Sequence, residues 1–241
     1  MINPFIVICF FAFILIIGLS QKKISSVTDY IYSGRKVTAP ALIATLVTTW
    51  YGGINEIGLE VIHNGIVTWV YFGLVYYVSA FFYAYIIAPK IVNKNYSSIP
   101  IAIYKNYGKI PAIISLIVVF MYLLPASYLI ILGQLINQIF DINNIYTSIF
   151  IGLIVSTIYT LKGGFSSIIQ TDKVQFIFMF LGFFILSLYL FLSENYGINI
   201  IYDLYNREPI MFEIPGKRQW SFIGVFALLS LATFIDPSFH Q

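Results

Sequence analysis

Seven apolar segments, each of a length that can cross a lipid bilayer, constrain the fold of this chain most strongly. They cover residues 4–20, 39–62, 66–88, 111–139, 144–162, 173–193 and 219–235. A membrane-spanning helix needs roughly 17 to 25 mostly apolar residues, at about 1.5 Å of rise each. Backbone groups in lipid must find partners within their own segment, and no segment alternates in polarity as a barrel strand does. The sequence therefore predicts an all-α integral membrane protein with about seven transmembrane helices.

The charge content supports the same class. Only 10% of the residues are charged, whereas about a quarter are charged in a typical soluble domain. The net charge of +3 is small and scattered, which argues against a nucleic-acid partner. The single cysteine, Cys9, excludes an intramolecular disulfide and a cysteine-based metal site.

The distribution of basic residues predicts the orientation. The first apolar segment has no positive residue before it, while Lys22 and Lys23 follow it, so it is interpreted as a retained helix rather than a signal peptide. Ten of the 13 Lys and Arg residues fall in the loops after the first, third and fifth segments. By the positive-inside rule these loops face the cytoplasm. We expect a multi-pass protein of the cell (plasma or inner) membrane with its N-terminus outside.

The second segment contains two adjacent glycines, Gly52 and Gly53, followed by Asn55 and Glu56. Glycine lowers helix stability by about 1 kcal/mol relative to alanine. An unwound stretch here would expose carbonyl oxygens to a small hard cation, as broken helices of secondary transporters do near the midplane. The alternative, equally compatible with the spacing, is that the glycines let another helix approach closely.

Two further polar features lie in the apolar segments. Glu56 and Glu60 share a helix face; Glu60 is interpreted as reaching water at the outer interface, and Glu56 as facing the pathway. Pro125 predicts a structural kink in the fourth segment. His63 is interpreted as a loop residue rather than a metal ligand.

Three stretches resemble the sodium:solute symporter family. They are Asp29-Tyr-Ile-Tyr-Ser-Gly-Arg35, Thr48-Thr-Trp-Tyr-Gly-Gly53, and Tyr159-Thr-Leu-Lys-Gly-Gly164 continuing to Thr171-Asp-Lys-Val-Gln175. Their order and spacing fit the family over nearly the whole chain. The resemblance implies a LeuT-type core of two inverted five-helix repeats behind one extra helix, of which this chain would hold a part.

The resemblance also implies a domain organisation. Residues 1–241 would form a single transmembrane domain: an extra N-terminal helix and inner loop over 1–38, the first repeat over 39–193, an external loop over 194–218, and the first helix of an incomplete second repeat over 219–241.

The resemblance further assigns site residues. Sodium would bind the backbone carbonyls of Thr48 and Tyr51. Trp50, Gly52, Gly53, Asn55 and Glu56 would border the solute. Asp172 would lie on the sodium exit path, and as a residue before an apolar run it could equally cap the sixth helix.

The resulting hypothesis is sodium-coupled symport of a small organic solute, with Na+ as coupling ion and no other cofactor, by a truncated or split chain that pairs with a separate C-terminal half. No nucleophile–base pair, phosphate-binding loop or metal cluster is apparent, so the sequence predicts a non-enzyme. The alternatives are a non-transporting membrane sensor or accessory module, and an inactive remnant of a symporter.

Overall fold

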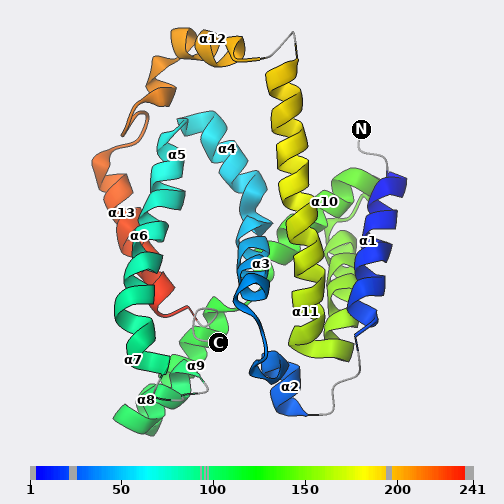
Figure 1. Cartoon of the computed structure of the whole chain (residues 1–241), viewed down its shortest axis with the longest axis vertical. Coiled ribbons are helices and arrows are strands. Elements are labelled where there is room, and N and C mark those ends of the chain that lie inside the picture. Colours follow the sequence, from blue (N-terminus) through cyan, green and yellow to red (C-terminus); the bar gives the residue numbers. More distant parts are fainter. Residues whose placement is uncertain are drawn as a thin grey trace. The chain divides into compact units, whose positions relative to one another are not determined.

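The computed structural model describes residues 4–21, 26–92, 94, 96, 98–193 and 197–236, and these residues form helices and their connections (Figure 1). The α-helices are α1 (Pro4–Leu19), α2 (Val27–Tyr32), α3 (Ala39–Trp50), α4 (Ile54–Asn64), α5 (Val67–Trp69), α6 (Val75–Phe82), α7 (Ala88–Val92), α8 (Ile99–Tyr107), α9 (Lys109–Tyr122), α10 (Ala126–Phe140), α11 (Ile145–Leu192), α12 (Asn199–Arg207) and α13 (Trp220–Ser230). Short 3₁₀ turns adjoin several of them, and two π-helical segments, Val70–Leu74 and Tyr83–Ile87, join α5, α6 and α7 into one continuous helix.

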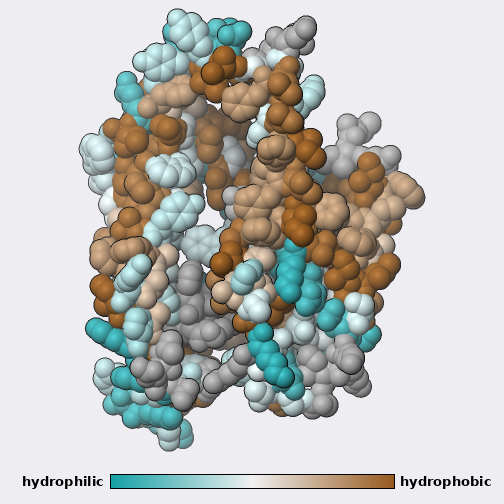
Figure 2. Space-filling model, in the orientation of Figure 1, coloured by the Kyte–Doolittle hydropathy of each residue, from teal (hydrophilic) through white to brown (hydrophobic). Residues whose placement is uncertain are grey.

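Several of these helices have the length and composition of membrane spans. Val67–Ile91, Lys109–Phe140 and Ile145–Leu192 are long and apolar enough to cross a bilayer, and Pro4–Leu19, Ala39–Trp50 and Trp220–Phe234 are shorter apolar helices. Large apolar side chains remain exposed along them, for example Leu192 at 74%. Apolar residues accordingly cover much of the face seen in Figure 2. The prediction of an all-helical membrane protein is confirmed.

The chain divides into two compact units. Unit 1 contains residues 1–53 and 125–189, and unit 2 contains residues 54–124 and 190–241. The chain therefore passes from one unit to the other after Gly53, after Leu124 and after Tyr189.

Small residues set the close packing of unit 1. A side chain at Gly18 of α1 would lie 2.6 Å from Cβ of Tyr159, and the Gly18 carbonyl accepts a hydrogen bond of 2.8 Å from Ser167 Oγ. A side chain at Gly133 of α10 would likewise lie 2.4 Å from Ile149 of α11. Since apolar helices gain little from burial when lipid is the solvent, close approach at small residues is how such helices hold together.

An aromatic core holds unit 2 together. Tyr71 is fully buried, and its ring lies 5.2 Å and 4.9 Å from the rings of Phe222 and Phe226 on α13. Further along the same pair of helices, the buried hydroxyls of Ser79 and Ser230 share a hydrogen bond of 2.6 Å. The helix over 67–92 and α13 are thus joined at two levels.

The structure corrects the fourth predicted segment. A single kinked helix over 111–139 was expected, but α9 ends at Tyr122 and α10 begins at Ala126. Pro125 lacks a backbone N–H, so the helical hydrogen-bond ladder cannot pass through it. The result is a full interruption rather than a bend.

The structure also corrects the loop expected between the fifth and sixth segments. Residues 163–172 are helical, and the interruption is confined to Gly164, whose φ and ψ of 53° and −144° are not helical. At about 1.5 Å per residue, the parts of α11 before and after Gly164 are about 28 Å and 42 Å long. Each is long enough to cross a bilayer core, as the two predicted segments were.

Two loops carry helices of their own. The loop after the third segment contains α8, which the sequence analysis did not predict, because it is only nine residues long and contains Pro100. The predicted external loop over 194–218 contains α12, followed by the 3₁₀ turn Pro209–Phe212. The basic pair Lys22 and Lys23 lies outside the described residues.

Candidate ion and solute site

The second predicted helix is interrupted at its paired glycines. The α-helix α3 ends at Trp50, Tyr51–Gly53 form a 3₁₀ turn, and α4 begins at Ile54. The regular α-helix is thus interrupted at the glycine pair, which is one of the two alternatives that the sequence left open. The break differs from the expected unwinding in that the chain stays coiled and changes helix type, with a tighter hydrogen-bond geometry over one turn.

Gly52 also has a packing role. A side chain at Gly52 would lie 2.6 Å from Cε1 of Tyr128, on α10 of the same unit. The glycine therefore lets an aromatic ring of α10 lie directly on the interrupted turn. The two interpretations of the glycine pair, a broken helix and a close helix contact, are both present. Sequence reasoning did not identify Tyr128, since nothing in its local pattern links it to a residue 76 positions earlier.

Threonine hydroxyls weaken the helix just before the break. Thr48 Oγ1 donates to the carbonyls of Ala44 and Thr45, at 2.9 Å and 3.0 Å, and Thr49 Oγ1 donates to the Thr45 carbonyl at 2.9 Å. Such hydrogen bonds back to the preceding turn bend helices. The threonine hydroxyls bond to the carbonyls of Ala44 and Thr45, which precede the predicted sodium ligands. The predicted ligands themselves are the backbone oxygens of Thr48 and Tyr51.

The remaining predicted site residues fall on both units. Trp50 and Gly53 belong to unit 1, and the Trp50 side chain is 43% exposed. Glu56 lies in the first turn of α4, in unit 2, and its side chain is exposed. The side chains of Tyr51 and Asn55 lie outside the described residues, although their backbones belong to the 3₁₀ turn and to α4.

Asp172 is a buried acid facing α3. It lies inside α11, eight positions after Gly164, so the prediction that it caps a helix is wrong. Its carboxylate faces Thr45 of α3. Asp172 Oδ2 and Thr45 Oγ1 are both buried and find no hydrogen-bond partner among the described residues. Buried polar atoms are nearly always bonded, and the Thr45 hydroxyl is the group that faces this carboxylate.

Two of the motif stretches meet in unit 1. Tyr30 OH donates a hydrogen bond of 3.0 Å to the Thr160 carbonyl, and a side chain at Gly164 would lie 2.4 Å from the Tyr30 carbonyl oxygen. The first stretch is also organised locally, because Ser26 caps α2 and donates to Asp29 Oδ2 at 2.7 Å. These stretches build a turn that holds α11 against α2, and their glycines serve that packing.

The comparison with family models decides the identity of the chain. The model described as "Sodium:solute symporter family" matches residues 30–207, which is more than half of the chain. The chain belongs to the sodium:solute symporter family. This family consists of transporters rather than enzymes, so the chain is a membrane transport protein of the symport class. No curated protein and no solved structure matches the chain significantly.

In this symporter-family chain, Glu60 is the centre of a polar cluster of unit 2. Its Oε2 atom accepts hydrogen bonds from Tyr71 OH at 2.7 Å, Asn64 Nδ2 at 2.7 Å and Arg218 Nη2 at 3.1 Å. The guanidinium of Arg218 also lies over the ring of Phe222, 4.4 Å from its centroid. The Glu60 carboxylate raises the pKa of Arg218 through this hydrogen bond. We name Glu60, Asn64, Tyr71 and Arg218 the outer clamp.

The outer clamp distinguishes the two acids of α4: the Glu60 carboxylate accepts three side-chain hydrogen bonds, whereas the Glu56 side chain is exposed. The Glu60 side chain is 35% exposed and is paired with Arg218. Sequence analysis missed Arg218 because 158 positions separate it from Glu60. The clamp attaches the loop before α13 to the end of α4, next to the hydrogen bond of 2.8 Å from Ile66 N to the Met211 carbonyl.

We expect Arg218→Met to destabilise the symporter-family chain by about 1–2 kcal/mol, since a hydrogen bond to a charged group contributes about 1.5–3 kcal/mol when buried and less when partly exposed. The unfolding midpoint in detergent measures this. Lys217→Met is the matched control: it removes the more exposed ion pair of Lys217 with Glu208 (2.9 Å) and should cost less than about 1 kcal/mol. Equal losses in the two variants would contradict the clamp.

Proposed function

We propose that this chain carries sodium-coupled symport of a small organic solute across the cell membrane. The single observation that carries the proposal is the 3₁₀ interruption at Tyr51–Gly53, inside the stretch that matches the family model. Membership in the family suggests sodium-coupled solute transport, and an interrupted helix is where secondary transporters place ion and solute sites.

The proposed roles follow the interrupted turn. The carbonyl oxygens of Thr48 and Tyr51 hold Na+, because a hard cation prefers oxygen ligands. The solute is bordered by Trp50, Gly52, Gly53, Asn55 and Glu56. Asp172 lies on the sodium path to the inside; this is supported by its buried carboxylate, which faces Thr45 of α3 within the same unit as the interrupted turn.

The proposed topology has seven spans in one transmembrane domain, with the N-terminus outside and part of a LeuT-type inverted repeat. Support comes from the basic residues, of which ten of 13 fall in alternate loops. The break of α11 at Gly164 adds to it, since a continuous helix of 48 residues would be about 72 Å long, more than twice the thickness of a bilayer core.

The test is binding of ²²Na⁺ to the purified chain, with Gly52→Leu as the variant. We expect wild-type chain to bind ²²Na⁺ and Gly52→Leu to lose at least about tenfold in affinity, which corresponds to about 1.4 kcal/mol, because leucine would displace Tyr128 and distort the turn. Gly58→Leu is the matched control, since a side chain at Gly58 of α4 meets nothing within 4 Å. Absence of sodium binding by the wild type would overturn the proposal.

A second variant separates the two roles of Gly52. In Gly52→Leu with Tyr128→Ala, the clash with the ring is relieved, so the thermal stability should recover while sodium binding stays impaired. If ²²Na⁺ binding returns together with stability, Gly52 serves only to pack α10 against the turn, and the argument from the broken helix fails.

A further inference from the structure

A cavity of about 290 Å³ lies in unit 2. It is lined by the end of α7, described residues of the segment that follows it, α8 and the turn after α13, and it is open on one side. Its walls are mostly apolar, with Ile91, Ile103 and Phe234 among them. Lys90, Lys94, Tyr96 and Asn106 supply polar groups. The cavity therefore combines an apolar interior with cationic side chains.

The polar side of the cavity is held in place by α8. Asn106 Nδ2 donates to Tyr96 OH at 3.3 Å and to the Ala102 carbonyl at 2.7 Å. Lys105 Nζ lies 5.3 Å from the centroid of the Tyr96 ring, within the range of a cation–π contact. Tyr96 therefore lies between the Asn106 amide and the Lys105 ammonium group. Lys105 adds a third positive charge to those of Lys90 and Lys94.

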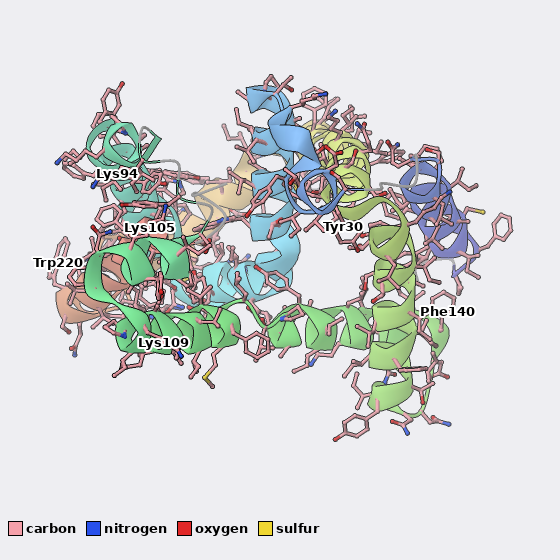
Figure 3. The ribbon with its side chains drawn as sticks, turned by 90° about the horizontal axis from the view of Figure 1, so that it is seen from below. Tyr30, Lys94, Lys105, Lys109, Phe140 and Trp220 are labelled. Carbon is pink, nitrogen blue, oxygen red and sulfur yellow. The ribbon has the colours of Figure 1, made fainter. Side chains whose placement is uncertain are left out.

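The charge around this cavity is positive and largely uncompensated. The sequence has no Asp or Glu between Glu60 and Asp141, a stretch that includes Lys90, Lys94, Lys105 and Lys109. Figure 3 shows Lys94, Lys105 and Lys109 gathered at the same end of unit 2, and Figure 2 shows a hydrophilic group over α7 and α8. Within the part of the chain that the structure describes, the two ion pairs lie elsewhere, at Lys217 and at Arg218.

One acid lies close by. Asp236 follows Ile235, which lines the cavity, and it accepts a hydrogen bond of 3.3 Å from Tyr122 OH. With Lys90, Lys94 and Lys105 set against this one carboxylate, the surroundings keep an excess of positive charge.

We propose that this cavity binds an anionic phospholipid, with Lys90 and Lys94 holding the headgroup phosphate and the apolar wall receiving the start of an acyl chain. A lysine is a point charge with three donors, well suited to phosphate oxygens. Basic pockets beside membrane helices on the predicted cytoplasmic side are suited to lipid headgroups. A cavity of about 290 Å³ admits a headgroup and the first carbons of a chain rather than a whole lipid.

The apolar wall favours a lipid over a free anion. A free phosphate ion would gain nothing from Ile91, Ile103 and Phe234, whereas each buried methylene of a lipid chain adds to its affinity. The helix surface beside the cavity is itself apolar and exposed, for instance Ile110 at 74%, which suits contact with lipid.

The experiment is lipid retention by the purified full chain, measured by native mass spectrometry with phosphatidylglycerol or phosphatidylcholine of identical acyl chains. We expect preferential retention of phosphatidylglycerol. Since a lysine near an anionic lipid changes the affinity roughly fivefold, Lys90→Gln with Lys94→Gln should weaken phosphatidylglycerol binding about thirtyfold. Lys36→Gln with Lys173→Gln removes the same charge outside the cavity and should leave binding nearly unchanged.

Two further arms test the cavity itself. Ala102→Trp fills the cavity without changing the charge, and it should weaken retention of phosphatidylglycerol. Millimolar inorganic phosphate should fail to displace the lipid. Equal retention of the two lipids, equal loss in both lysine pairs, full retention by Ala102→Trp, or displacement by inorganic phosphate would each overturn the proposal.

Discussion

Gly164→Ala is expected to lower the free energy of unfolding by about 3 kcal/mol or more. At φ 53° and ψ −144°, Gly164 occupies a backbone region that residues with a side chain rarely adopt, at a cost of about 1–3 kcal/mol. The new Cβ would also lie 2.4 Å from the Tyr30 carbonyl oxygen, which is backbone and cannot move aside cheaply. Overpacking of this kind adds about 1–3 kcal/mol. A loss of this size is a large part of the 5–15 kcal/mol by which domains are typically stable.

Detergent-solubilised protein unfolded with increasing denaturant measures this loss. Gly182→Ala is the control, because Gly182 lies in the regular part of the same helix, α11, and a side chain there meets nothing within 4 Å. Alanine at that position should be neutral or stabilising by up to about 1 kcal/mol. If both alanine variants are equally stable, the chain does not turn at Gly164.

Gly65→Ala is expected to destabilise the chain by a similar amount, through unit 2. Gly65 has a φ of +74°, and a Cβ there would lie 2.0 Å from the Met211 carbonyl oxygen. That oxygen accepts the hydrogen bond from Ile66 N, so moving it would also break this contact. We expect a loss of about 3 kcal/mol or more, from backbone strain and collision together.

Gly108→Ala separates the two causes. Gly108 has a φ of +87°, but a side chain there meets nothing within 4 Å, so alanine at this position costs only the backbone strain of about 1–3 kcal/mol. The difference between the two variants measures how closely the Met211 loop approaches the α4–α5 turn. A Gly65→Ala variant no less stable than Gly108→Ala would show that this approach does not exist in solution.

The sequence predicts the apolar helices well, since their lengths are fixed by the thickness of a bilayer. At Gly52 and Gly53 the sequence left two alternatives open, an interrupted helix and a close helix contact, and the structure contains both. The sequence predicted a kink at Pro125, whereas the α-helix is fully interrupted there. The loop expected at 163–172 was wrong because it was placed where the apolar segments 144–162 and 173–193 end and begin, whereas the backbone between them is helical except at Gly164.

Contacts between distant residues were beyond the sequence. Tyr128 over Gly52, Arg218 on Glu60, and Tyr30 against Gly164 each join residues more than 70 positions apart. Local pattern carries no information on such pairs. The family motifs gave the positions of the glycines but not the reason for them, which is the close approach of another element.

The places where the chain changes unit have a mechanical consequence. Two of the three crossings, at Gly53–Ile54 and Leu124–Pro125, coincide with points where the regular α-helical ladder is already interrupted. A local change of backbone torsion at either point therefore meets a helical hydrogen-bond ladder that is already interrupted. The third crossing, at Tyr189–Leu190, lies within α11, so a torsion change there would break regular α-helical hydrogen bonds.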